Sequence, residues 1–120
     1  MQLDQIDPTR TVMIVVDMQN DFVAARAPME TPAARATVPV LSASLDACRS
    51  AGVRVIYTAH VHRPDGSDLG NFKELDDRIA THKALVDGTP GVEIYPDLQP
   101  APGEHVIKEH RYSAFFGNKN

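Results

Sequence analysis

The sequence contains no tryptophan and only one cysteine, Cys48, among its 120 residues. A single thiol excludes an internal disulfide, which fits the reducing conditions of the cytoplasm, where we expect the protein to reside. Long apolar runs are absent as well, since the longest, Val12–Val16, ends at Asp17. A run of this length is too short to span a bilayer or to form the core of a signal peptide, so no membrane partner is expected.

Positive charge is also scarce. The chain has 12 lysines and arginines against 16 aspartates and glutamates, for a net charge of −4. This balance argues against non-specific binding to nucleic acid, which requires a basic surface. The content of 42% hydrophobic and 23% charged residues is typical of globular proteins and excludes disordered and fibrous classes. We expect residues 1–120 to form a single domain.

Three short apolar runs predict strands of an α/β fold. They cover Val12–Val16, Val53–Thr58 and residues 105–108. Unbroken hydrophobicity, rather than alternation with polar residues, is typical of strands in a parallel sheet whose two faces are both covered. The irregular stretch 63–104, with a weakly helical patch near 72–86, is long enough to predict a functional loop.

The segment between the first two runs predicts a helix, because its apolar residues recur at helical spacing. Thr37 can cap the start of this helix, Pro39 is tolerated in its first turn, and Gly52 suits the position just after its end. Residues 24–36 are expected to form a surface loop. Cys48 falls on the apolar stripe of the helix, so we assign it a structural role rather than that of a nucleophile.

Charged side chains follow the predicted strands at the edge where open parallel sheets bind ligands. Asp17 follows the first strand and Lys108 the third. A carboxylate at the mouth of a dry sheet should have a raised pKa unless a nearby cation holds it ionised. An Asp17–Lys108 pair would suit the activation of a nucleophile. In the simpler alternative, Asp17 caps a backbone turn and Lys108 is a surface charge.

Two histidines follow the second strand. His60 and His62 are two residues apart, hence on one face of an extended segment, and with Asp65 and Asp68 they could hold a metal. However, no third histidine stands at ligand spacing, and Asp65-Gly66 is also an ordinary turn pair. A metal site, a polar pocket lining and hydrogen bonding within the loop all remain open.

Three stretches together carry a resemblance to a known family: VMIVVDMQNDF, GVRVIYTAHVHRPDGSD and VIKEHRYSAFFG. In order and spacing they resemble the isochorismatase-like cysteine hydrolases, which include nicotinamidases, carbamoylsarcosine-type amidases, and biuret and ureidoacrylate hydrolases. The resemblance covers essentially residues 10–118. It implies a doubly wound, Rossmann-like three-layer α/β/α fold around a six-stranded parallel sheet. It also implies a homo-oligomer that cleaves a C–N bond of a small amide or ureido substrate with an Asp–Lys–Cys triad and no cofactor.

The resemblance assigns roles to individual residues. Asp17 matches the general base, and Lys108 matches the cation that lowers the pKa of the thiol and steadies the anion. In the nicotinamidase branch an Asp-x-His pair binds a metal after the second strand, but the aligned pair here is His60-x-His62, so no metal is expected. The implied substrate-pocket residues are Gln19, Phe22, His60, Tyr112, Ser113 and Phe116.

The nucleophile departs from the family pattern. In the family it follows a fourth strand, tens of residues beyond the lysine, whereas Cys48 falls on the first helix. We therefore expect the C-terminal strands and the nucleophile to be missing, with Asn118 capping a helix that does not follow, and the chain alone to be inactive. The first strand would then be an exposed apolar edge that promotes association. The alternatives are an inactive remnant and a metal-dependent hydrolase that uses His60 and His62.

Overall fold

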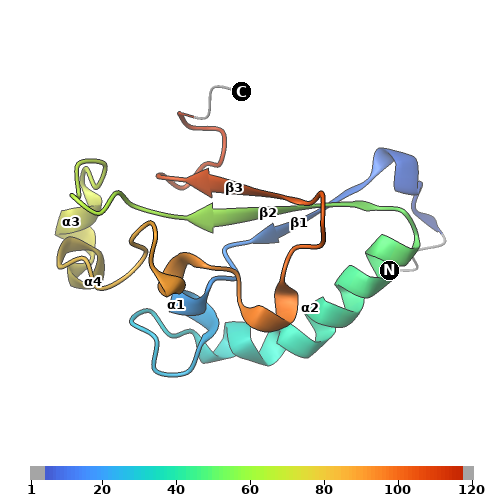
Figure 1. The fold of residues 1–120 in the computed structure, drawn as a ribbon, viewed down its shortest axis with the longest axis horizontal. Coiled ribbons are helices and arrows are strands. Elements are labelled where there is room, and N and C mark those ends of the chain that lie inside the picture. Colours follow the sequence, from blue (N-terminus) through green and yellow to red (C-terminus); the bar gives the residue numbers. More distant parts are fainter. Residues whose placement is uncertain (1–4, 118–120) are drawn as a thin grey trace.

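Figure 1 shows the computed structural model of the chain, in which residues 5–117 are described. Three parallel strands form one sheet in the order β1-β2-β3, with β1 at Val12–Val16, β2 at Arg54–His60 and β3 at His105–Glu109. This confirms the predicted α/β fold and its parallel sheet. The first strand has the predicted bounds, the second begins one residue later and extends to His60, and the third is one residue longer than predicted.

Apart from η2, which precedes β1, the helices described in the chain cover one face of the sheet and its carboxyl edge. Their bounds are η2 (Pro8–Arg10), α1 (Asn20–Val23), α2 (Pro32–Ser50), α3 (Phe72–Leu75), α4 (Asp77–Ala80), η3 (Pro90–Val92) and η4 (Pro96–Leu98). Helices α1 and α2 lie on one side of the sheet, while α3 and α4 lie beyond the carboxyl end of β2 (Figure 1). None of the helices within residues 5–117 has the length and hydrophobicity of a membrane span.

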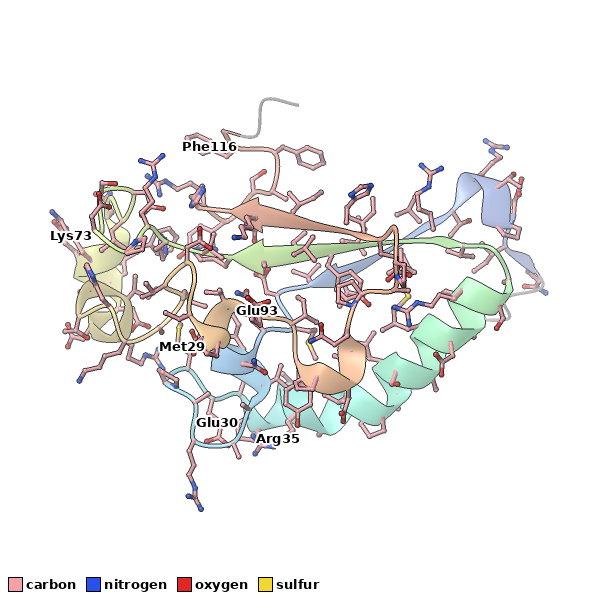
Figure 2. The ribbon with its side chains drawn as sticks, viewed as in Figure 1. Met29, Glu30, Arg35, Lys73, Glu93 and Phe116 are labelled. Carbon is pink, nitrogen blue, oxygen red and sulfur yellow. The ribbon has the colours of Figure 1, made fainter. Side chains whose placement is uncertain are left out.

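The other face of the sheet carries no helix among the described residues. Only the segment that follows β3 crosses it, and Figure 2 shows Phe116 on the side opposite to α2. As a result Val12, Ile14 and Val16 of β1 are 46%, 59% and 61% exposed, although they alternate with the buried Val15. We refer to this side as the open face.

The predicted start of the long helix was wrong. Helix α2 begins at Pro32, with Thr31 as its N-cap, so residues 32–36 are helical rather than part of a loop. Proline is well suited to the first helical position, because its φ is already set and its missing N–H would be unpaired there anyway. Pro39 lies inside the helix, on its exposed side, and Gly52 follows its end with φ 78°, as predicted.

The core lies between α2 and the covered face of the sheet. Leu45 and Tyr57 are almost completely buried there, at 1% and 0% exposure. Cys48 packs in the same cluster, as its position on the apolar stripe predicted. The buried members of this cluster are Val15, Val23, Val38, Leu45, Cys48, Val53, Val55, Tyr57, Ile94 and Leu98.

Arg49 ties the end of α2 to the sheet and to the loop before β3. Its guanidinium donates to both carboxylate oxygens of Glu104, at 2.8 and 2.9 Å, and to the Tyr57 hydroxyl at 3.0 Å. Such two-pronged, charge-assisted hydrogen bonds are among the stronger polar contacts in proteins. The same contact lowers the pKa of Glu104 below its usual value.

We expect Glu104→Gln to lower the free energy of unfolding by roughly 1–2 kcal/mol at neutral pH, because the ionic part of this contact is lost. The folded-state pKa of Glu104 lies below the unfolded value of 4.5, so its contribution exists above that pH and disappears as the pH falls through the folded pKa. Urea denaturation at neutral and acidic pH measures the difference. The exposed Glu74→Gln is the matched control, and an equal loss at both pH values would contradict the assignment.

Candidate active site

The open face is hollowed at the carboxyl ends of the strands. The hollow has a volume of about 990 Å³ and an apolar floor to which Ile14, Ile56 and Ile107 contribute, one from each strand. Ile56 and His60 are four residues apart on β2, so their side chains project from the same face of the sheet. Ile56 is paired with Ile14 of β1, and His60 is paired with Glu109 of β3. The hollow is therefore apolar along the sheet and polar at its rim.

Asp17 lies at this rim, immediately after β1. Its backbone is in the left-handed region, with φ 52°, and its carboxylate accepts a hydrogen bond from Thr58 Oγ1 at 2.8 Å. A residue other than glycine is uncommon in this conformation, which occurs often at functional sites. The turn places the Asp17 side chain in the lining of the hollow, in agreement with its predicted position at the rim.

Glu109 is a second carboxylate at the same point, and the sequence prediction did not include it. Its side chain is buried, and burial followed by the negative charge of Asp17 raises its pKa. One side-chain ligand atom from each of Asp17, His60 and Glu109 lies within 4.8 Å of the others. Glu109 could have been predicted at this point only from its pairing with His60 across β2 and β3, and the sequence alone does not give that register.

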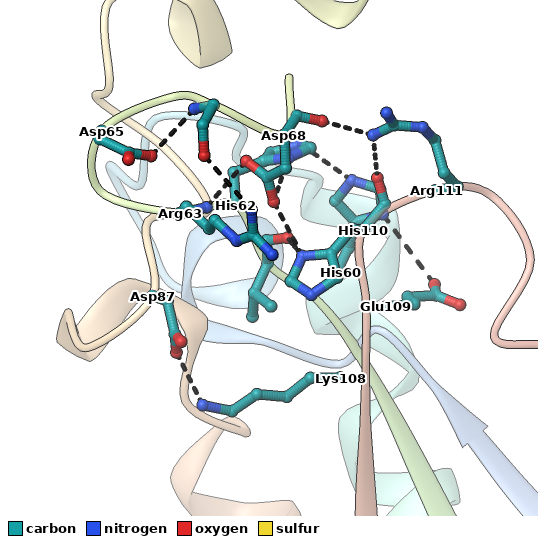
Figure 3. A network of polar contacts seen from close by, with 12 residues as sticks. His60, His62, Arg63, Asp65, Asp68, Asp87, Lys108, Glu109, His110 and Arg111 are labelled. Atoms are coloured by element: carbon teal, nitrogen blue, oxygen red, sulfur yellow. Dashed lines mark hydrogen bonds and ion pairs between the residues drawn. The ribbon is translucent and has the colours of Figure 1, made fainter. Parts of the chain in front are cut away.

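Lys108 lines the same hollow as Asp17, but its ammonium pairs with Asp87. Its ammonium donates to Asp87 Oδ1 at 2.7 Å, as Figure 3 shows. The physical reason is strand alternation, because neighbouring residues of β3 project from opposite faces and Glu109 occupies the face that holds the hollow. Glu109 is therefore the side chain of β3 that interacts with Asp17 in this structure, and the pairing of Asp17 with Lys108 stays a prediction.

His60 and His62 do come together, as their spacing predicted. Their Nε2 atoms are 3.0 Å apart, so one ring must donate to the other. Burial, and then the neighbouring His62, lowers the pKa of His60 to about 4, which makes its imidazole neutral at neutral pH. His62 Nδ1 is 3.7 Å from Asp68 Oδ2, and His110 Nδ1 is 2.8 Å from the same oxygen (Figure 3). Asp65 stays outside this group and accepts from Ser67 N.

Gln19 and Phe22 are not part of the lining of the hollow, and the substrate contacts predicted for them stay a prediction. Gln19 is fully buried, and its amide donates to the carbonyls of His60 and Val92 at 2.9 and 3.0 Å. Its Oε1 accepts from His60 N at 2.8 Å. Phe22 is half-buried between two core clusters. Gln19 therefore holds the backbone at the end of β2 and fixes the position of His60.

We expect Gln19→Glu to destabilise the fold by about 3 kcal/mol or more, because a carboxylate cannot donate to the two carbonyls and its charge would be buried. Urea denaturation measures the loss. The exposed Asn71→Asp makes the same amide-to-acid change and should cost little. If the two variants lost equal stability, the described role of Gln19 would be refuted.

The segment after β3 borders the hollow. Tyr112 lines it and packs its ring 5.0 Å from that of Phe72, although it remains 84% exposed. Ser113 is exposed and accepts from Phe115 N at 3.3 Å. The Arg111 guanidinium lies over the Phe116 ring at 5.9 Å. The structure thus places Tyr112 in the hollow and the other two predicted residues beside it; Asn118 lies outside the described residues.

Known proteins resemble this chain over nearly its whole length. A family model described as the isochorismatase domain matches residues 11–119. The ureidoacrylate amidohydrolase of Rhizobium rhizogenes is 30% identical over 128 residues, which cover 92% of this chain and 52% of that protein.

Two solved structures show the same likeness in three dimensions. A cysteine hydrolase from Pseudomonas syringae matches with a TM-score of 0.85 at 33% identity, covering 93% of this chain and 52% of that one. The N-carbamoylsarcosine amidase of Thermoplasma acidophilum matches with a TM-score of 0.70 at 28% identity, covering 89% and 56%. The chain therefore spans about half the length of these proteins.

Proposed function

Because the chain belongs to the isochorismatase domain family, we propose that it contributes to a hydrolase that cleaves the C–N bond of a small amide or ureido substrate. The names of the ureidoacrylate amidohydrolase and the N-carbamoylsarcosine amidase support this substrate class. The observation that carries the proposal is the position of Asp17, held by Thr58 at the rim of a hollow with an apolar floor. The apolar floor limits water around a small bound substrate.

In this proposal Asp17 acts as the general base. Its carboxylate takes the proton of a thiol, and the resulting thiolate attacks the carbonyl carbon of the substrate. The C–N bond breaks as Asp17 returns this proton to the leaving nitrogen, and water then hydrolyses the thioester to free the thiol. Cys48, the single cysteine of the printed sequence, is buried on α2 in the core, so the thiol must come from residues outside this sequence. His60, neutral and beside Asp17, can hydrogen-bond the substrate carbonyl or amide.

We assign the role of the cation in the triad to Lys108. It lines the same hollow as Asp17, and its ion pair with Asp87 joins two exposed side chains, a kind of pair that contributes little to stability, so the ammonium can leave Asp87. The group beside Asp17 is Glu109, whose negative charge does not stabilise a thiolate. In this proposal the Lys108 ammonium leaves Asp87 and steadies the thiolate when it forms.

The proposal is tested by joining residues 1–117 to the C-terminal half of the Pseudomonas syringae cysteine hydrolase, which would supply the thiol. The expected result is ammonia release from ureidoacrylate, N-carbamoylsarcosine or a related small amide. The same chimera should not cleave a carboxylic ester of similar size at a comparable rate. A folded chimera that is inert toward all amide and ureido compounds would contradict the proposed reaction.

A further inference from the structure

Glu109 is a buried carboxyl group that the proposed reaction does not use. It ends β3, is 5% exposed and lines the hollow together with Asp17. An oxygen of each of these two carboxyl groups and a ring nitrogen of His60 all lie within 4.8 Å of one another. A buried carboxyl group this close to a second one either has an opposite charge beside it or stays neutral.

The basic side chains on both sides of Glu109 are bonded to other groups. The ammonium of Lys108, the preceding residue, donates to Asp87 Oδ1 at 2.7 Å. The guanidinium of Arg111, two residues further on, donates to the backbone carbonyl of Asp68. Neither of these contacts neutralises a charge on Glu109, so in this arrangement the carboxyl group is better accommodated with its own proton.

The histidines around Glu109 do not supply a positive charge either. His60 Nδ1 is 4.0 Å from Glu109 Oε1 (Figure 3), but burial lowers the pKa of His60 to about 4, so its ring is neutral at neutral pH. His62 and His110 both face the carboxylate of Asp68, with Nδ1 atoms at 3.7 and 2.8 Å from Oδ2. The other titratable groups that line the hollow are His105, at the start of β3, and Tyr112.

The surroundings of the two carboxyl groups favour a proton on Glu109 rather than on Asp17. Burial, followed by the negative charge of Asp17 and a hydrogen bond with it, raises the pKa of Glu109. Asp17 is only half-buried and accepts from Thr58 Oγ1 at 2.8 Å, a contact that favours its ionised form. When the environments of two neighbouring carboxyl groups differ in this way, one is neutral and the other ionised.

We propose that Glu109 is a positioning residue, whose neutral carboxyl group donates a hydrogen bond to Asp17 and leaves Asp17 as the ionised base. With the Thr58 hydroxyl, it gives the Asp17 carboxylate two fixed donors and leaves lone pairs free for the thiol proton. The proton of Glu109 stays in place during the reaction. The inference rests on the proposed function and deepens it, because an ionised Glu109 would oppose the formation of a thiolate beside Asp17.

The first test measures protonation on the chain itself. Carbon-13 NMR follows the labelled side-chain carboxyl groups as the pH is changed, and Glu109→Gln identifies the signal of Glu109. We expect this signal to titrate at a higher pH than a glutamate in an unstructured peptide. Asp17→Asn removes the neighbouring negative charge and should lower that pH. Titration of Glu109 as in an unstructured peptide, or no response to Asp17→Asn, would overturn the proposal.

The second test is the pH dependence of kcat/KM for the chimera. Glu109→Leu removes the donor and should lower kcat/KM about tenfold, with the acidic limb of the profile moved to higher pH because Asp17 ionises less readily. Glu109→Gln, whose amide can still donate to Asp17, should recover most of this loss and restore the position of the limb. Glu74→Leu makes the same change at an exposed position and should leave the profile unaltered.

An acidic limb that does not move in Glu109→Leu, or an equal loss of activity in the leucine and glutamine variants, would show that Glu109 only supports the fold and would refute its positioning role. The NMR titration needs no hydrolysis, so its result is separate from that of the proposed function. A chimera inert toward every amide would contradict the reaction, while the NMR titration would still decide where the proton lies.

Discussion

Asp17→Asn is expected to reduce amide hydrolysis by the chimera about a thousandfold while leaving its melting temperature nearly unchanged. Asparagine has the shape of aspartate and can still accept the hydrogen bond from Thr58 Oγ1, but it cannot take a proton from a thiol. Asparagine also tolerates the left-handed backbone at φ 52°, whereas alanine would add strain and confuse the result. The measurement is kcat/KM for ammonia release, together with a thermal melt.

Thr58→Val provides the graded comparison for this prediction. It removes the hydroxyl that orients the Asp17 carboxylate but keeps the base itself, so we expect a loss of about tenfold, far smaller than for Asp17→Asn. Activity of Asp17→Asn within a few-fold of the unmodified chimera would exclude the role of Asp17 as general base, whatever the effect at Thr58.

The location of the site was predictable from the sequence because it depends on strand ends. The unbroken run Val12–Val16 marks a parallel strand, and the residue after such a strand lies at the ligand-binding edge, which placed Asp17 correctly. Its left-handed backbone was not predictable, since nothing in the local sequence demands φ 52° at an aspartate.

The identity of the residues in the site was less predictable, because it depends on the face of the sheet from which each side chain projects. A shift of one residue along a strand moves a side chain to the opposite face, so a single position decides which of Lys108 and Glu109 faces Asp17. The short run before them is apolar throughout and shows no alternation that would reveal the covered face. Asp87, which binds Lys108, comes from an irregular segment that sequence patterns do not place.

The role of Gln19 shows a second limit of the sequence. An amide near a predicted site suggests substrate binding, and only the structure shows that this amide donates to backbone far away in the sequence. The Val92 carbonyl that Gln19 bonds is 73 residues away along the chain, at the end of a short turn. Contacts of this kind depend on tertiary packing, and the composition and periodicity of the residues around Gln19 do not predict it.

The open face predicts that the chain associates with itself. Val12 and Ile14 are 46% and 59% exposed on a strand whose outer edge has no partner among residues 5–117, and Phe115 beyond β3 is 93% exposed. Apolar surface beside an unpaired strand edge favours contact with another chain. We expect sedimentation velocity to show dimers or larger species whose proportion rises with protein concentration.

Lysines at Val12 and Ile14 should convert this population to monomer. Both side chains already face water, so their replacement removes little buried surface from the single chain, while two charges along one edge oppose the approach of another strand. Leu75→Lys, at a residue that is 71% exposed on α3, makes the same chemical change away from the sheet and should leave association unaltered. If the wild-type chain were monomeric at every concentration, or if Leu75→Lys dissociated it as well, the open face would not be the contact surface. Dissociation by the Val12 and Ile14 substitutions alone would assign the contact to β1, the strand that carries Asp17 at its end.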